Sequence, residues 1–187
     1  MKTSVVKRLD FEFLNSIVKV VANRNHPEIK LAGVTIGPFE EGNEYETYYW
    51  IAKELEKSGI ARVGEDESLS PTKISKIQWT ERVQTAGQVS KVPENFYPKL
   101  RRYLSELKRD IVKAPEKMLE FEKAKNLARD VVNTRVRKIV AIASAPAQTE
   151  QAFKNFTLEE RFLYDQLHQL ISEWRTEILE YNEAEEE

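Results

Sequence analysis

The residues that could do chemistry in this 187-residue chain are few and scattered. The chain has two histidines and no cysteine, which excludes disulfides, thiolate metal sites and cysteine nucleophiles. His26 stands beside Pro27 in a predicted turn, and His168 lies on the last predicted helix. Because they are far apart in sequence and have no cysteine partners, we interpret both as surface or rim histidines rather than metal ligands.

The adjacent carboxylates in the sequence give little further evidence of catalysis or metal binding. Glu159 and Glu160 could suggest an acid–base pair, but Thr157 and Glu160 have the spacing of a capping box, and Glu159 suits the first turn of a helix. Asp66 lies among other acids in what we interpret as a solvated linker. The phosphate-loop, dinucleotide and HExxH signatures are absent from the sequence. We therefore predict no catalytic residue, no metal site and no cofactor, and we expect the protein not to be an enzyme.

Charge is the clearest pattern. Residues 99–138 hold thirteen Lys and Arg against six Asp and Glu, whereas residues 139–187 hold three against eleven. Arg135, Arg137 and Lys138 crowd onto a predicted helix whose other face is apolar. We interpret this helix as one that packs on other helices and presents cations to an acidic partner, because charge complementarity selects partner and register. A salt-bridged, solvated surface is the alternative.

The same cations suit a second function, the binding of nucleic acid. Arg101, Arg135 and their neighbours could contact phosphates, and Tyr97 or Tyr103 could stack on bases. Against this, these aromatic residues fall on the apolar stripe of their helix, and the acidic last helix would repel a phosphate backbone packed nearby. Direct binding of nucleic acid is therefore expected to be weak at most.

The first 64 residues predict a small β-rich module. Strands are expected at residues 17–21, 29–36 and 60–63, with a helix at 48–57 that ends at Gly59 in a left-handed conformation. Residues 65–92 are expected to form a linker with one short helix, which starts at Ser70-Pro71 and has an apolar side made by Ile74, Ile77 and Trp79.

Three longer helices are predicted after this linker, over about 94–112, 116–143 and from Thr157 onward. Pro115 stops the first of them. The last carries an apolar stripe made of Phe162, Leu163, Leu167, Leu170, Ile171, Trp174 and Ile178. The fold class is therefore α+β, with a small β-rich domain (1–64) before a mainly helical bundle domain (93–187).

Hydrophobic residues make up 41% and charged residues 32% of the chain, as in soluble globular proteins. No apolar run approaches the ~20 residues needed to span a bilayer. Asp10 and Glu12 interrupt the segment where an export signal would need an apolar core. We expect a cytoplasmic protein that does not contact membranes.

Several motifs, in order, resemble the GINS family. Gly37-Pro38-Phe39 precedes a W-x-A-x-x-L helix with Trp50 and Leu55, as in the small domain of GINS subunits. VPENFYPKL (with Phe96 and Tyr97), RVRKIV and FTLEERFLYDQL are similar to three motifs of the family's helical domain. The β-rich module comes first, as in the archaeal class that corresponds to the second and third partner-of-Sld-five proteins.

The resemblance implies a non-catalytic replication scaffold. GINS subunits form tetramers, and the resemblance implies that this chain forms either a heterotetramer with a sister subunit or a homotetramer. GINS tetramers associate with the MCM helicase and with a RecJ/Cdc45-like protein, and they also contact primase. Such a protein would be nucleoid-associated. The resemblance makes Gly37, Pro38, Phe39, Trp50 and Leu55 structural. Together with the charge pattern it leads us to expect the partner interface at Phe96, Tyr97, Arg101, Arg135, Arg137, Lys138, Phe162 and Trp174.

Overall fold

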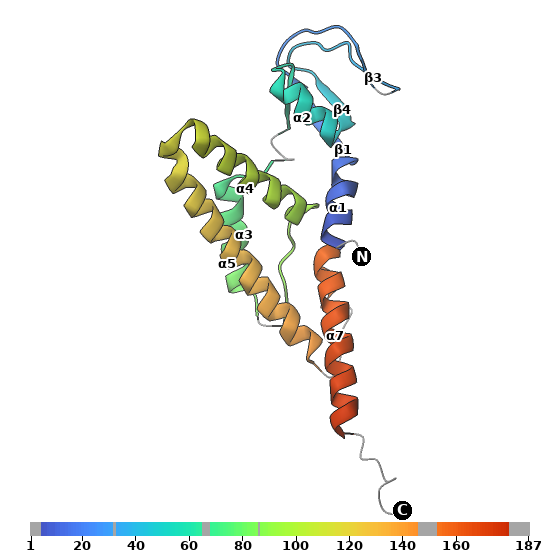
Figure 1. Cartoon of the computed structure of the whole chain (residues 1–187), viewed down its shortest axis with the longest axis vertical. Helices are drawn as coiled ribbons and strands as arrows, with labels where there is room; N and C mark the ends of the chain where they lie inside the picture. The colour runs from blue at the N-terminus through green and yellow to red at the C-terminus, as the bar shows by residue number, and fades with distance from the viewer. Residues whose placement is uncertain (1–4, 32, 65–67, 86, 146–152, 180–187) are drawn as a thin grey trace, which may run out of the picture. The chain divides into compact units, whose positions relative to one another are not determined.

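The computed structural model of the chain describes residues 5–31, 33–64, 68–85, 87–145 and 153–179. The chain divides into two compact units, the first made of residues 1–70 with 97–106, and the second made of residues 71–96 with 107–187. Among these described residues, helices outnumber strands and every strand lies in the first unit (Figure 1). The predicted α+β class, with a small β-rich part before a helical bundle, is confirmed.

The first unit begins with α1 (Val5–Leu14), which leads into β1 (Ile17–Ala22). β1 is the centre of a three-stranded antiparallel sheet in the order β4-β1-β5, with β4 at Glu44–Tyr48 and β5 at Ala61–Val63. Val18, Val20 and Ala22 alternate along β1 toward the core, as expected of a half-buried strand. Helix α2 (Tyr49–Lys57) follows β4 directly and contributes Ile51, Ala52 and Leu55 to the same core.

The second predicted strand is split in two. β2 (Ile29–Leu31) and β3 (Val34–Ile36) form an antiparallel hairpin, and Gly33 at its turn has a φ of 82°. A side chain at that φ would be strained, so glycine permits the reversal that the continuous apolar run concealed. At the end of α2, Gly59 adopts the predicted left-handed conformation, with a φ of 66°.

Two elements of this unit were not predicted. α1 was missed, although Leu9 and Phe13, one helical turn apart, are both buried. The strand β4 was missed because every second residue in it is acidic. In the structure β4 pairs with β1, and Thr47, which lies opposite Val18, is buried. The acidic side chains therefore occupy the outward positions of an otherwise ordinary sheet strand.

The second unit contains α3 (Pro71–Val83), the last part of α4 (Phe96–Lys113), the short 3-10 turn η2 (Pro115–Lys117), α5 (Met118–Ala143) and α7 (Leu158–Leu179). α5 is the central helix, since both α3 and α7 pack against it. Pro115 ends α4 as predicted, and α3 begins at the predicted Pro71. The acidic segment 182–187 and Asp66 lie outside the described residues.

Candidate protein-interaction interface

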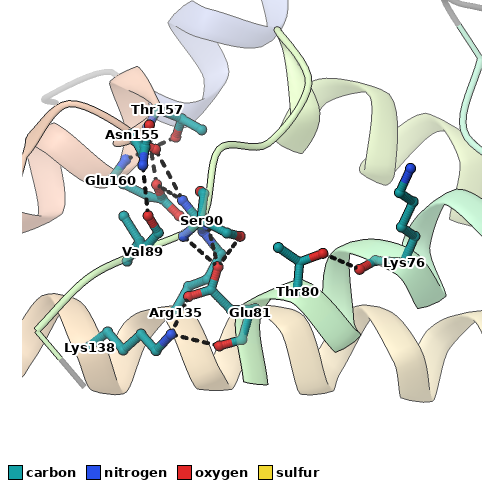
Figure 2. A network of polar contacts seen from close by, with 10 residues as sticks. All are labelled: Lys76, Thr80, Glu81, Val89, Ser90, Arg135, Lys138, Asn155, Thr157 and Glu160. Carbon is teal, nitrogen blue, oxygen red and sulfur yellow. Dashed lines mark hydrogen bonds and ion pairs between the residues drawn. The ribbon is translucent and has the colours of Figure 1, made fainter. Parts of the chain in front are cut away.

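The predicted cation cluster on α5 is largely internal. Arg135 has no exposed surface, and Lys138 is buried as well. The guanidinium of Arg135 donates from Nε and Nη2 to the two carboxylate oxygens of Glu160, at 2.5 and 2.7 Å. Its Nη1 donates to Oε2 of Glu81 at 2.7 Å. Figure 2 shows these residues meeting from three helices, since Glu81 lies on α3 and Glu160 on α7.

Backbone carbonyls complete the guanidinium's partners. Nη1 also donates to the carbonyl of Ser90 at 2.8 Å, and Nη2 to the carbonyl of Asn155 at 3.3 Å. All five N–H groups of Arg135 therefore have acceptors, which is what a fully buried guanidinium requires. The Nζ of Lys138 lies 2.8 Å from Oε1 of Glu81 and donates to its backbone carbonyl at 2.6 Å. Two positive and two negative side chains thus form a neutral buried cluster.

The pKa of Glu81 reflects this environment. Burial alone would raise that pKa, but hydrogen bonds from Lys138 and Ser90 and the charge of Arg135 outweigh burial and hold it below its ordinary value. Both the backbone N–H and the hydroxyl of Ser90 donate to Oε2 of Glu81. Lys138, Ser90 and Arg135 therefore stabilise the charged form of Glu81 inside the bundle.

Glu160 also closes the predicted capping box at the start of α7. The backbone N–H of Thr157 donates to Glu160 Oε2 at 3.0 Å, and the backbone N–H of Glu160 donates to the Thr157 hydroxyl at 3.3 Å. The capping box is confirmed, but the sequence did not reveal that the same carboxylate binds Arg135. One residue thus joins the first turn of α7 to the middle of α5.

These contacts correct part of the predicted interface. Arg135 and Lys138 cannot present their charges to a partner, because Glu81 and Glu160 already neutralise them inside the unit. Phe96 is likewise fully buried. Arg101 is half-buried and binds the Asp10 carboxylate within the first unit, with Nη2 and Oδ1 2.8 Å apart. Tyr97 is half-buried too.

The remaining predicted interface residues are exposed. Arg137 lies on the outer side of α5, and Phe162 and Trp174 lie on α7. Leu163, Leu167 and Ile171 pack against a core cluster that contains Ile139 and Tyr164. On the same helix, Leu170 and, beyond Ile171, Trp174 and Ile178 are 64%, 60% and 63% exposed. We refer to these last three residues as the α7 stripe.

The α7 stripe continues the buried face of its helix. Leu170, Trp174 and Ile178 follow Leu163 at intervals of seven, four and four residues, which keeps them on one side of an α-helix. Exposed Glu173 and Glu177 border one side of the stripe and exposed Arg175 lies near its other side, so charged residues surround it. An exposed apolar row of this kind, with polar residues beside it, is typical of a protein–protein interface.

Other kinds of site find little support. One prediction about α3 was wrong, since the side chain of Trp79, which we expected on the apolar side of this helix, is exposed to solvent. The described residues contain no group of three or more histidine or acidic side chains that could hold a metal ion. His26 binds the carbonyl of Pro27 through Nδ1 at 2.8 Å, and His168 stacks on Tyr164. Within the described part of the chain, no helix is both long and apolar enough to cross a membrane.

The GINS-like motif of the first unit has a structural role. Phe39 is buried among the core residues, and its backbone pairs with that of His26. Gly37 has a φ of 95°, and a side chain there would approach the Phe39 ring to 3.0 Å. Leu55 is in the core and Trp50 packs against it. Phe39, Leu55 and Trp50 thus contribute to the packing of the small unit.

The fold and the interface together describe an α+β protein whose larger part is a helical bundle with an exposed apolar row on its last helix. Residues 68–179 match the family known as the GINS complex protein helical bundle domain, Sld5. The chain therefore belongs to the GINS family and is a GINS complex subunit involved in DNA replication. It is also 26% identical to the human DNA replication complex GINS protein PSF2 over 157 residues, which cover 81% of this chain and 80% of PSF2.

Proposed function

We propose that this chain is a non-catalytic scaffold subunit that assembles with sister GINS subunits into a tetramer through the α7 stripe. The observation that supports this proposal is that the apolar face of α7 extends beyond the part that packs on α5. Obligate interfaces bury on the order of 2,000 Å² or more and are more apolar than ordinary surface. Glu173 and Glu177 beside the stripe would favour positive charge at the facing part of the sister surface.

The proposed tetramer would act by binding. We propose that it joins the MCM helicase and a RecJ/Cdc45-like protein, and that it also contacts primase. A scaffold of this kind stabilises one conformation of the motor, and its effect cannot exceed its difference in affinity for the motor's states. The helical bundle would hold the tetramer together and the small β-rich unit would serve as the docking element. We propose that a protein with this role acts in the cytoplasm, at the nucleoid.

The similarity to PSF2 and the position of the β-rich module before the helices favour the class that corresponds to the second and third partner-of-Sld-five proteins. The alternative, a basic-helix module that binds forked DNA without a tetramer, has less support. Two of the seven cations that motivated it, Arg135 and Lys138, are neutralised inside the protein. A gel shift on forked DNA at low salt by the isolated chain would revive that alternative.

Placing a negative charge on the α7 stripe tests whether this stripe is the interface of the tetramer. Trp174→Glu should lower the mass of the complex formed with a co-expressed sister subunit, as measured by light scattering, and should leave the unfolding transition of the isolated chain nearly unchanged. Val112→Glu is the matched control, because Val112 is an exposed apolar residue of α4. An unchanged mass for the Trp174→Glu complex would rule out the α7 stripe as the interface.

A further inference from the structure

A second exposed apolar surface lies on α3. Trp79 and Val83 are 67% and 65% exposed and stand four residues apart, so they are neighbours on one face of the helix. The opposite face of α3 holds Ile74 and Glu81, both fully buried. Tryptophan is one of the residue types enriched at the positions that carry most of the binding energy of protein interfaces. This surface is on a different helix from the α7 stripe.

A small hollow adjoins these two side chains. Its volume is about 270 Å³, and it lies between the end of α3 and the segment that follows, lined by Trp79, Thr80, Val83, Gln84, Thr85 and Gln88. This volume lies below the range of roughly 300–1,000 Å³ that is usual for small-molecule sites. The lining contains no charged residue. The hollow is therefore suited to one apolar side chain of a larger partner rather than to a cofactor.

The exposed charges of α3 are positive. Lys76 is exposed, and Arg82 is exposed while donating to Asp130 of α5 at 3.0 Å. The single acidic residue of α3 is Glu81, and its carboxylate is taken up inside the protein by Arg135 and Lys138. Because Glu81 is neutralised inside the protein and Asp130 already pairs with Arg82, Lys76 is the exposed positive charge on this side of the helix that attracts an acidic segment.

We propose that this face of α3 docks an acidic peptide segment of a partner protein. One apolar side chain of that segment enters the hollow beside Trp79 and Val83, and its carboxylates lie near Lys76 and Arg82. A nucleic acid fits less well, since the hollow has no cation in its lining to hold a phosphate. The site does not depend on the proposed tetramer, so either can fail without the other.

The experiment uses the full-length chain and a fluorescein-labelled synthetic peptide with a leucine–phenylalanine pair flanked by glutamates. We expect saturable binding by fluorescence anisotropy, weakening as salt rises. Trp79→Ala should reduce the affinity about tenfold or more, as for a central interface residue. Lys76→Glu should reduce it as well, whereas Trp174→Ala on α7 should not.

Three further probes decide between the possible ligands. A peptide with lysines in place of the glutamates, and one with serines in place of the apolar pair, should both bind weakly. If either binds as well as the acidic apolar peptide, or if Trp79→Ala binds as the native chain does, the proposal is wrong. Binding of oligothymidylate that is lost in Trp79→Ala, without binding of the acidic peptide, would also overturn it and assign the face to nucleic acid.

Discussion

Arg135 and Glu160, on α5 and α7, are joined by two parallel hydrogen bonds of 2.5 and 2.7 Å inside the helical bundle. The same carboxylate caps the first turn of α7. A bidentate pair of this kind fixes orientation as well as distance, because both guanidinium nitrogens must face both oxygens. The start of α7 is thereby set by the middle of α5.

Removing the guanidinium of Arg135 should strongly lower the free energy of unfolding. Arg135→Met leaves two buried carboxylates with only Lys138 to neutralise them, so we expect the free energy of unfolding to fall by about 3–5 kcal/mol. Chemical denaturation measures this directly. Arg137→Met, two residues away on the exposed side of the same helix, should change it by about 0.5 kcal/mol or less. Equal effects in the two variants would show that the buried cluster does not stabilise the bundle.

The two roles of Glu160 can be separated by comparison with its capping partner. Thr157→Ala should cost about 1 kcal/mol, the usual effect of losing a cap. Glu160→Ala should cost more, because it also leaves the guanidinium of Arg135 buried with fewer partners. In a double-mutant cycle, Glu160→Ala and Arg135→Met should be strongly non-additive. Additive effects would mean that the two side chains contribute independently.

Stability should depend on pH through Glu81. The pKa of this carboxyl is lower in the folded protein than its ordinary value of 4.5, so its stabilising effect is fully present above that value. It is lost as pH falls from there through the lower, folded-state pKa. Urea denaturation in acid should therefore show a smaller loss of stability for Glu81→Gln than for the native chain. Glu173→Gln, an exposed control on α7, should follow the native chain.

Two glycines of the small unit form a matched pair. Gly37 and Gly42 both have positive φ, of 95° and 84°, but a side chain would meet the Phe39 ring only at Gly37. Both alanine variants should lose about 1–3 kcal/mol from backbone strain. Gly37→Ala should lose more, because the close approach to Phe39 adds to that strain. Thermal unfolding compares the two, and identical transitions would show that the Phe39 contact relaxes freely.

Local signals predicted the helix ends well. Pro71 begins α3, Pro115 ends α4, Gly59 follows α2 and Thr157 caps α7, and each acts through its own backbone geometry or nearby hydrogen bonds. Such features need only a few neighbouring residues. β4 depended on pairing with β1, which lies more than twenty residues earlier in the chain, so its own acidic residues gave a misleading signal.

The candidate interface was harder to predict. Arg135 stands four residues from both Val131 and Ile139, which are buried, so its place on the inner face of the helix was readable. Its partner Glu81 lies 54 residues away, and no sequence spacing brings it there. The charge pattern showed that opposite signs would meet, but it could not show that they meet within one chain.

The buried cluster that contains Arg135 and Glu160 lies at the N-terminal end of α7, a helix of 22 residues. Ile178 is eighteen residues beyond Glu160, about 27 Å along the helix axis at 1.5 Å per residue. A change in the angle at which the helix leaves its anchor is therefore amplified at the far tip, where ~10° becomes a sideways displacement of roughly 5 Å. Mutations deep inside the protein can thus misplace surface residues that they never touch.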